Sequence, residues 1–197
     1  MKTILKTLIV PHVDYCSQLW MPTTPKGIET IEKLQKHFFN IIPAIRQLNY
    51  WDQLKEMKML SLQRRMERYR CIYTWKILEG LAPNCGVSVK LEGGRVGRKC
   101  AIPSRCTQAR VAVQTMREQT YQVHGPRLFN ALPVFIRNMT KCPLADFKMA
   151  LDKFLEQVPD EPRVSGLTPG GCSEAGPSNS LLEQVKRAEG GSRLVGL

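Results

Sequence analysis

The chain has 197 residues, 43% of them hydrophobic, which is enough for one domain with a buried core, or for one domain and a tail. Its 29 lysine and arginine residues exceed its 17 aspartate and glutamate residues, so the formal net charge is +12. This excess favours a polyanionic partner, most often a nucleic acid, and the lack of any run of about 20 apolar residues excludes an ordinary membrane-spanning helix.

Helical patterns follow one another through the first sixty residues. Residues 2–20 carry apolar side chains at helical spacing, and Pro11 is expected to end or kink that helix. Thr24 is a favourable N-cap for a second helix, which Pro43 would stop. Asn49 is expected to cap a short third helix.

The longest predicted helix spans residues 62–79, with Ser61 as its cap and Gly80 as its stop. The side opposite its apolar stripe carries Arg64, Arg68, Cys71 and Trp75. That side is either a solvated face with Trp75 packed on a neighbouring element, or an arginine strip that follows phosphates, with Trp75 free to stack on bases.

The pattern changes between residues 81 and 120. Alternating side chains at 87–91 and 110–115 predict a small β-hairpin, and the glycine-rich stretch 93–99 is a basic loop between the two strands. This stretch lacks the Gly-Lys-Ser/Thr of a P-loop. Arginine and lysine on such a loop suit sequence-independent phosphate contacts, and a plain surface hairpin is the alternative.

Residues 121–158 have apolar periodic patterns that favour structural roles. Leu128, Phe129 and Leu132 are expected to pack in the core, Asn130 to cap or bridge backbone groups, and His124 to be a satisfied structural side chain. Pro143 should begin a last helix with its buried stripe at Phe147, Leu151, Phe154 and Leu155.

After residue 158 proline, glycine and serine dominate, which predicts a disordered tail with a transient helix near 181–188. The predicted fold class is therefore mainly α, a helical bundle with a small β-hairpin insertion and a disordered C-terminal tail. The predicted regions are 1–80 (helical), 81–158 (basic hairpin plus C-terminal helices) and 159–197 (tail).

Five segments resemble, in this order, the C-terminal part of the reverse transcriptase of non-LTR retrotransposons of the LINE type, the jockey-like group. They are Leu8–Trp20, Ile28–Ile42, Tyr50–Arg65, Tyr121–Pro133 and Pro143–Leu155. The resemblance covers roughly residues 1–162. Gln53, Met57 and Phe129 depart from the commoner Arg, Leu and Trp of the family pattern, which leaves the subfamily open.

The resemblance implies a thumb-like helical region that follows the polymerase palm. It also implies that the chain holds template RNA or an RNA/DNA primer duplex, and packs on the palm, while the palm does the chemistry. The polymerase reaction needs paired aspartates for two metal ions, and no Asp-Asp pair occurs in the sequence. We therefore expect no catalytic residue and no enzyme activity.

The basic residues are concentrated in the middle of the chain. Residues 61–80 hold five basic and two acidic side chains, and residues 86–117 hold seven and one. We expect the cations there to neutralise a nucleic-acid backbone without reading bases. The predicted binding residues are Arg64, Arg65, Arg68, Arg95, Arg98, Lys99 and Arg105. The alternatives are a basic surface with no specific partner, and a relic reading frame that survives as a structural or interaction remnant.

The seven cysteines are dispersed and odd in number, and no secretory signal peptide is recognised. An intracellular setting with free thiols, nucleus or cytoplasm, is expected. Cys85, Cys100, Cys106 and His124 could in principle hold zinc, but they lack the C-x-x-C spacing of zinc sites. No metal and no cofactor are therefore predicted.

Overall fold

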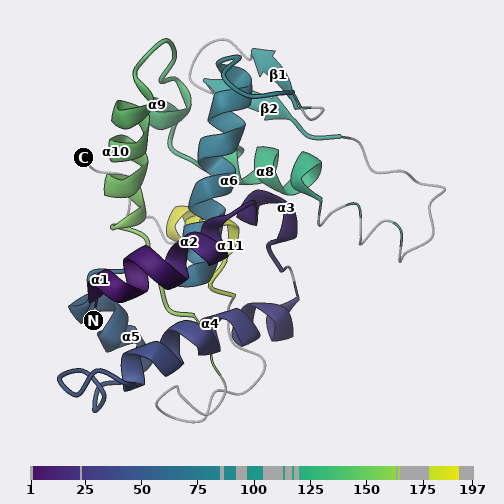
Figure 1. Cartoon of the computed structure of the whole chain (residues 1–197). Coiled ribbons are helices and arrows are strands. Elements are labelled where there is room, and N and C mark those ends of the chain that lie inside the picture. Colours follow the sequence, from purple (N-terminus) through teal and green to yellow (C-terminus); the bar gives the residue numbers. More distant parts are fainter. Residues whose placement is uncertain are drawn as a thin grey trace. The chain divides into compact units, whose positions relative to one another are not determined.

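The fold was analysed in a computed structural model. It describes residues 2–22, 24–84, 87–91, 97–103, 113, 117, 120–162, 164 and 178–190. As predicted, the described chain is mainly helical, with one antiparallel pair of strands (Figure 1). It forms two compact units, Met1–Met66 with Pro159–Leu197, and Glu67–Val158. This division differs from the predicted regions in two ways. The boundary between the units lies inside the longest helix, and the residues after Val158 belong to the first unit.

The first unit opens with a helical segment interrupted by a π turn and a bend. Its elements are α1 (Lys2–Ile4), the π turn η1 (Leu5–Ile9), α2 (Val10–Asp14) and α3 (Ser17–Trp20). Pro11 does not end the helix, since α2 continues through it to Asp14, and the π turn η1 directly precedes α2. The segment bends at Cys16 instead, whose φ is 51°.

Two further helices complete the core of the first unit. These are α4 (Pro25–Asn40) and α5 (Tyr50–Glu56). Both predicted caps are confirmed, since Thr24 Oγ1 accepts from the N–H of Gly27 at 3.2 Å and Asn49 Oδ1 from the N–H of Asp52 at 3.0 Å. Their apolar faces bury a shared cluster of side chains. It comprises Leu5, Val10, Phe38, Phe39, Ile45, Tyr50, Leu54, Met57 and Val164.

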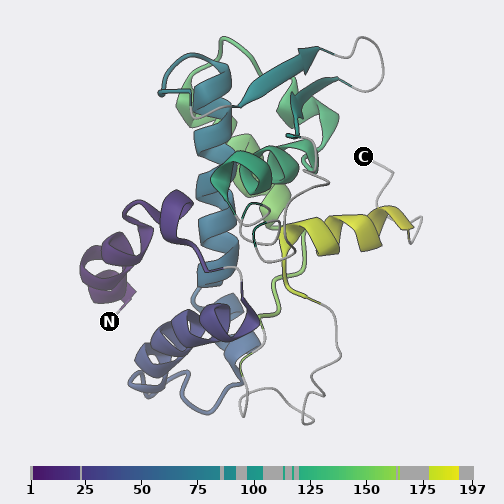
Figure 2. The same cartoon turned by 90° about the vertical axis from the view of Figure 1, so that its right-hand side faces the viewer.

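The longest helix, α6 (Leu62–Leu78), begins and ends as predicted (Figures 1 and 2). Ser61 Oγ accepts from the N–H of Arg64 at 3.1 Å, and Gly80 follows the helix with a φ of 73°. The side opposite the apolar stripe is only partly solvated, because Arg64 and Trp75 are fully buried and Arg68 is partly exposed.

The second unit contains the sheet. Strand β1 (Ser88–Leu91) pairs antiparallel with β2 (Arg98–Ala101). The first predicted strand is confirmed, but its partner lies at Arg98–Ala101, which begins where a loop was predicted. The predicted second strand at 110–115 lies outside the described residues except for Val113. The observed pairing closes a shorter loop, which lowers the entropy cost of joining the strands.

Helices α8 (Tyr121–Asn130), α9 (Val134–Arg137) and α10 (Leu144–Leu155) complete the second unit. The sheet and α8 lie side by side in both views (Figure 2). Asn130 joins them, since its amide donates to the carbonyl of Cys100 at 2.9 Å and accepts from the N–H of Cys100 at 2.8 Å. The predicted bridging role of Asn130 is therefore confirmed. Six of the predicted core residues are also buried, namely Leu128, Phe129, Leu132, Phe147, Leu151 and Leu155. Phe154, predicted to share the buried stripe of the last helix, is only partly buried.

Parts of the predicted tail belong to the first unit. Asp160 accepts from the N–H of Ser61 at 2.8 Å and from its hydroxyl at 2.7 Å. Trp51 Nε1 donates to the carbonyl of Pro162 at 2.9 Å. Helix α11 (Leu181–Gly190) follows, with Leu181 fully buried. The remaining residues of the predicted tail lie outside the described chain.

Candidate nucleic-acid interface

The first predicted binding residue, Arg64, is used inside the first unit. Its side chain is fully buried on the first turn of α6. Its Nη2 donates to the carbonyls of Pro159 and Asn179, both at 3.0 Å. A guanidinium in this position fastens the C-terminal segment to the helix start and is not accessible to a phosphate.

The next two predicted arginines of α6 pair with carboxylates. Arg65 makes a two-pronged contact with Asp14, with Nε–Oδ1 at 2.7 Å and Nη2–Oδ2 at 2.6 Å. Arg68 makes a similar contact with Asp152, with Nη2–Oδ2 at 2.7 Å and a second bond from its Nε. Both arginines remain partly exposed, but each has a carboxylate that already balances its charge.

Arg98 on β2 is also paired. Its Nη1 lies 2.5 Å from Glu79 Oε1, and its Nη2 donates to the carbonyl of Leu78 at 2.9 Å. Burial alone would raise the pKa of Glu79, but hydrogen bonds from the Lys141 N–H and from Arg98 outweigh it and lower that pKa. Arg98 therefore ties the sheet to the end of α6.

Of the other three predicted residues, the structure describes only Lys99. Lys99 is half-buried on β2, where it stands opposite Lys90 in the strand register. Arg95 and Arg105 lie outside the described residues. Of the five predicted residues that the structure describes, Arg64 is therefore buried, and Arg65, Arg68 and Arg98 are paired with carboxylates.

Trp75 is not available for base stacking. It is fully buried, and its ring stacks on Phe147 with centroids 4.7 Å apart. Its Nε1 donates to the carbonyl of Met139 at 2.7 Å. Of the two interpretations of this side of α6, packing against a neighbouring element is confirmed for Trp75, and α10 is that element.

His124 has the predicted structural role. Its Nδ1 lies 3.0 Å from Arg70 Nη1, and burial together with Arg70 and Arg127 lowers its pKa to about 4. The neutral ring therefore accepts a hydrogen bond from the guanidinium. In the described part of the chain, no three histidine, cysteine or carboxylate side chains are grouped to hold a metal. Cys85 and Cys106 lie outside that part.

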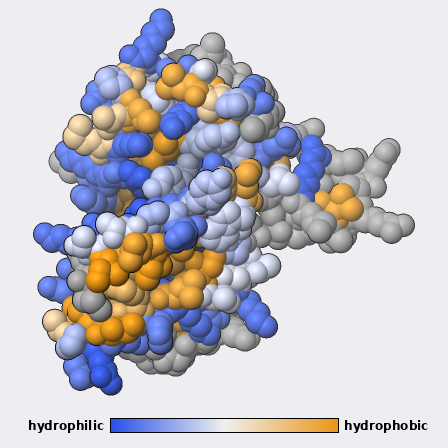
Figure 3. All heavy atoms as spheres, viewed as in Figure 1, coloured by the Kyte–Doolittle hydropathy of each residue, from blue (hydrophilic) through white to orange (hydrophobic). Residues whose placement is uncertain are grey.

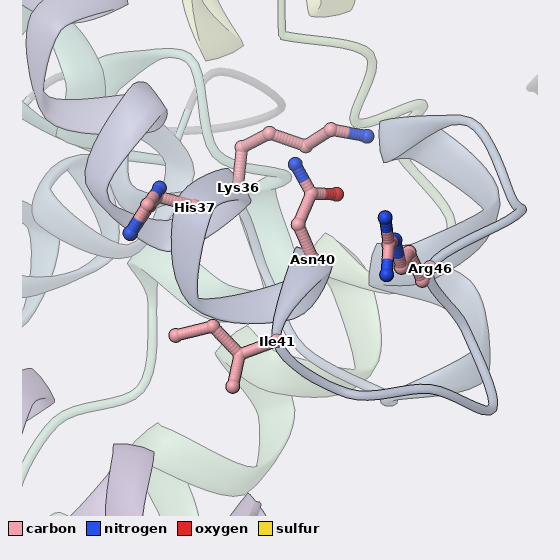
Figure 4. Close-up of a pocket in the computed structure, with 5 residues that line it drawn as sticks. All are labelled: Lys36, His37, Asn40, Ile41 and Arg46. Carbon is pink, nitrogen blue, oxygen red and sulfur yellow. The ribbon is translucent and has the colours of Figure 1, made fainter.

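A hollow that the sequence analysis missed lies at the C-terminal end of α4. It has a volume of about 530 Å³ and is lined by Lys36, His37, Asn40, Ile41 and Arg46. Lys36 and Asn40 extend toward the side where Arg46 lies, whereas His37 and Ile41 point to other sides of the helix end (Figure 4). Lys36, Arg46 and the amide of Asn40 thus share one concave surface of the first unit.

Gln53 on α5 bonds to two of the residues that line this hollow and to the loop that carries a third. It is fully buried, and its Oε1 accepts from Lys36 Nζ at 3.2 Å. Its Nε2 donates to the carbonyl of Ile45 at 2.9 Å and, more weakly, to Asn40 Oδ1 at 3.4 Å. One side chain therefore fixes the lysine, the asparagine and the loop that carries Arg46.

The positive charge of the hollow has no carboxylate to balance it. Lys36 is only 5% exposed, and burial lowers its pKa. Among the described residues, neither Lys36 nor Arg46 forms an ion pair. Glu32, one turn before Lys36, is occupied by Tyr50 Oη at 2.6 Å and the N–H of Gln63 at 2.7 Å, and burial raises its pKa to about 7.

One signal for the hollow was present in the sequence. The stretch from Lys33 to Leu48 contains Lys33, Lys36, His37 and Arg46 and no aspartate or glutamate. Its charge is lower than that of residues 61–117, so it did not stand out. The arginines of α6 and β2 were predicted instead, because a count of charges along the sequence does not reveal the distant acidic residues with which three of them pair.

None of the helices in the described ranges is long and apolar enough to cross a lipid bilayer. Comparison with protein-family models, with curated proteins and with solved structures finds no match for this chain.

Proposed function

We propose that this chain binds RNA or an RNA/DNA duplex through its basic surface, as a non-catalytic part of a retrotransposon-derived RNA-directed DNA polymerase. The observation that supports it is the charge balance. With 29 basic and 17 acidic residues, at least twelve cations cannot have a carboxylate of their own, however the ion pairs are arranged. A surplus of this size attracts polyanions and raises the rate of their association.

The proposed contacts are to the sugar–phosphate backbone. Lysine and arginine bind phosphates irrespective of sequence and release condensed counterions, so the affinity falls as salt rises. The three predicted arginines of α6 are occupied by Pro159, Asp14 and Asp152, and the proposal therefore assigns binding to cations outside those pairs. The bond-making part would be a neighbouring palm, in an intracellular setting.

The test is a filter-binding titration of the purified chain against structured RNA at a series of salt concentrations. We expect the logarithm of the association constant to fall linearly with the logarithm of salt, by about 0.7–0.9 for each phosphate neutralised. An RNA/DNA duplex used as competitor would show which of the two substrates binds more tightly. Failure to retain RNA at about 50 mM salt would refute the proposal.

A second candidate function is that of an interaction remnant, favoured by the apolar surface of the first unit. Large apolar side chains of the N-terminal segment are exposed, and Figure 3 shows hydrophobic surface over the region where α1 and α2 lie. They are Ile4, Leu8, Ile9, Tyr15, Leu19 and Trp20. Contiguous apolar surface of this kind indicates a face that another protein surface covers.

The two candidates predict different DNA upstream of the first codon. A continuing reading frame with an aromatic-x-Asp-Asp motif would support a polymerase part, since that turn holds the catalytic metals. Stop codons and frameshifts would support the remnant.

A further inference from the structure

We propose that the hollow at the end of α4 is a binding site for one phosphodiester of a nucleic-acid backbone, held by Lys36, Asn40 and Arg46. This inference rests on the proposed function and assigns a specific site to it. The last turn of α4 and the loop that follows it line the hollow, and Gln53 of α5 bonds to both of these segments. Because Gln53 bonds to Lys36, to Asn40 and to the carbonyl of Ile45, these two side chains and the backbone beside Arg46 are held in place before any ligand arrives.

The donors have capacity left for an anion. Lys36 Nζ can donate three hydrogen bonds, and one is used by Gln53. The Oδ1 of Asn40 accepts from Gln53, so its amide N–H groups are left for a ligand. Arg46 is exposed and makes no side-chain bond among the described residues, so its forked guanidinium can approach a phosphate with two parallel bonds.

The charges favour an anion over any other ligand. Lys36 and Arg46 supply two positive charges, and none of the five lining residues is acidic. The C-terminal end of α4 opposes an anion with a partial charge of about half an electron, which the two cations exceed. An anion beside Lys36 would also compensate the desolvation that lowers the pKa of this buried amine.

The shape favours a phosphate that belongs to a chain. At about 530 Å³ the hollow is larger than a single phosphate needs, which leaves room for the sugar on either side. Free inorganic phosphate has the same chemistry as the backbone, so the experiment has to separate the two sources.

The experiment measures the binding of inorganic phosphate and of a short single-stranded RNA to the full chain. Side-chain NMR signals of Arg46 Nε and Asn40 Nδ2 report phosphate directly, and a salt titration reports RNA. The two test variants are Arg46→Ala and the nearly isosteric Asn40→Asp, which places a carboxylate in the hollow. Both residues are exposed, so the fold should survive. The matched control is Lys26→Ala, which removes one exposed charge at the opposite end of α4.

We expect phosphate to shift both NMR signals, and each test variant to weaken RNA binding about tenfold, as the loss of a charge-assisted contact predicts. Arg46→Ala should also reduce the salt slope by about 0.7, whereas the control should weaken binding less than about twofold. If Arg46→Ala and Lys26→Ala weaken RNA binding equally, the site is refuted and the proposed function stands. If wild-type chain binds phosphate in the hollow but no RNA, both proposals are refuted as stated. RNA binding without any shift of the two signals also refutes the site.

Discussion

Replacing Arg64 by methionine tests whether the most buried of the predicted binding residues is structural. Methionine keeps the apolar stem of the side chain and removes the guanidinium. That group donates to the carbonyls of Pro159 and Asn179, both at 3.0 Å, and the whole side chain is inaccessible. The variant therefore loses two charge-assisted bonds and leaves two carbonyls without these donors.

Each bond from a charged donor contributes about 1.5–3 kcal/mol, so Arg64→Met should lower the free energy of unfolding by about 3 kcal/mol or more. With a urea m-value of about 2 kcal/mol/M, the midpoint of urea unfolding should fall by about 1.5 M. The affinity for RNA under folding conditions, and its dependence on salt, should stay at the wild-type values.

The matched control is Arg46→Ala, which removes the same charge from an exposed loop position. Its free energy of unfolding should change by less than about 0.5 kcal/mol. An unchanged urea midpoint for Arg64→Met, together with weaker and less salt-dependent RNA binding, would refute this reasoning and restore Arg64 as a phosphate contact.

Three further predictions concern other parts of the chain. Asn130→Asp should cost about 2 kcal/mol in a thermal melt, because a carboxylate cannot donate to the Cys100 carbonyl; a variant as stable as wild type would contradict the bridge. Burial raises the pKa of Glu32 from 4.5 to about 7, so the folded state holds an extra proton between those values and loses stability as the pH rises through them. In urea unfolding, Glu32→Gln should therefore be up to about 3 kcal/mol more stable than wild type at about pH 8 and as stable as wild type near pH 4. Equal stability of the two proteins at both pH values would refute the raised pKa of Glu32. Removing Arg68 and Asp152 singly and together should give a coupling energy of about 1 kcal/mol that weakens with salt; a coupling of zero at low salt would show that the pair contributes nothing.

The ends of the helices could be predicted from the sequence because their causes are local. Thr24, Asn49 and Ser61 each accept from an N–H three residues ahead, and Gly80 supplies the left-handed conformation after α6. These signals lie within one turn of the residue that they affect. The hairpin was harder, since alternating patterns at 87–91 and 110–115 do not say which segment a strand will pair with.

The arginines show where sequence reasoning fails. Arg68 and Asp152 are 84 residues apart, and Arg64 and Asn179 are 115 apart. A linear count of charges treats such arginines as exposed, because long-range pairing has no sequence pattern. In the hollow, by contrast, Lys36 and Arg46 are close in the sequence. They line one hollow only in the folded chain, where Gln53 bonds to Lys36 and to the carbonyl of Ile45.

The polar contacts of Ser61 have a consequence for the order in which the chain matures on the ribosome. The long-range partners of Ser61 are Asp160 and Asn179, beyond the whole of the second unit. During translation the second unit, residues 67–158, leaves the ribosome ahead of these partners. The contacts of Ser61 with Asp160 and Asn179 can therefore form only after Asn179 has also emerged, and they are late steps in closing the first unit.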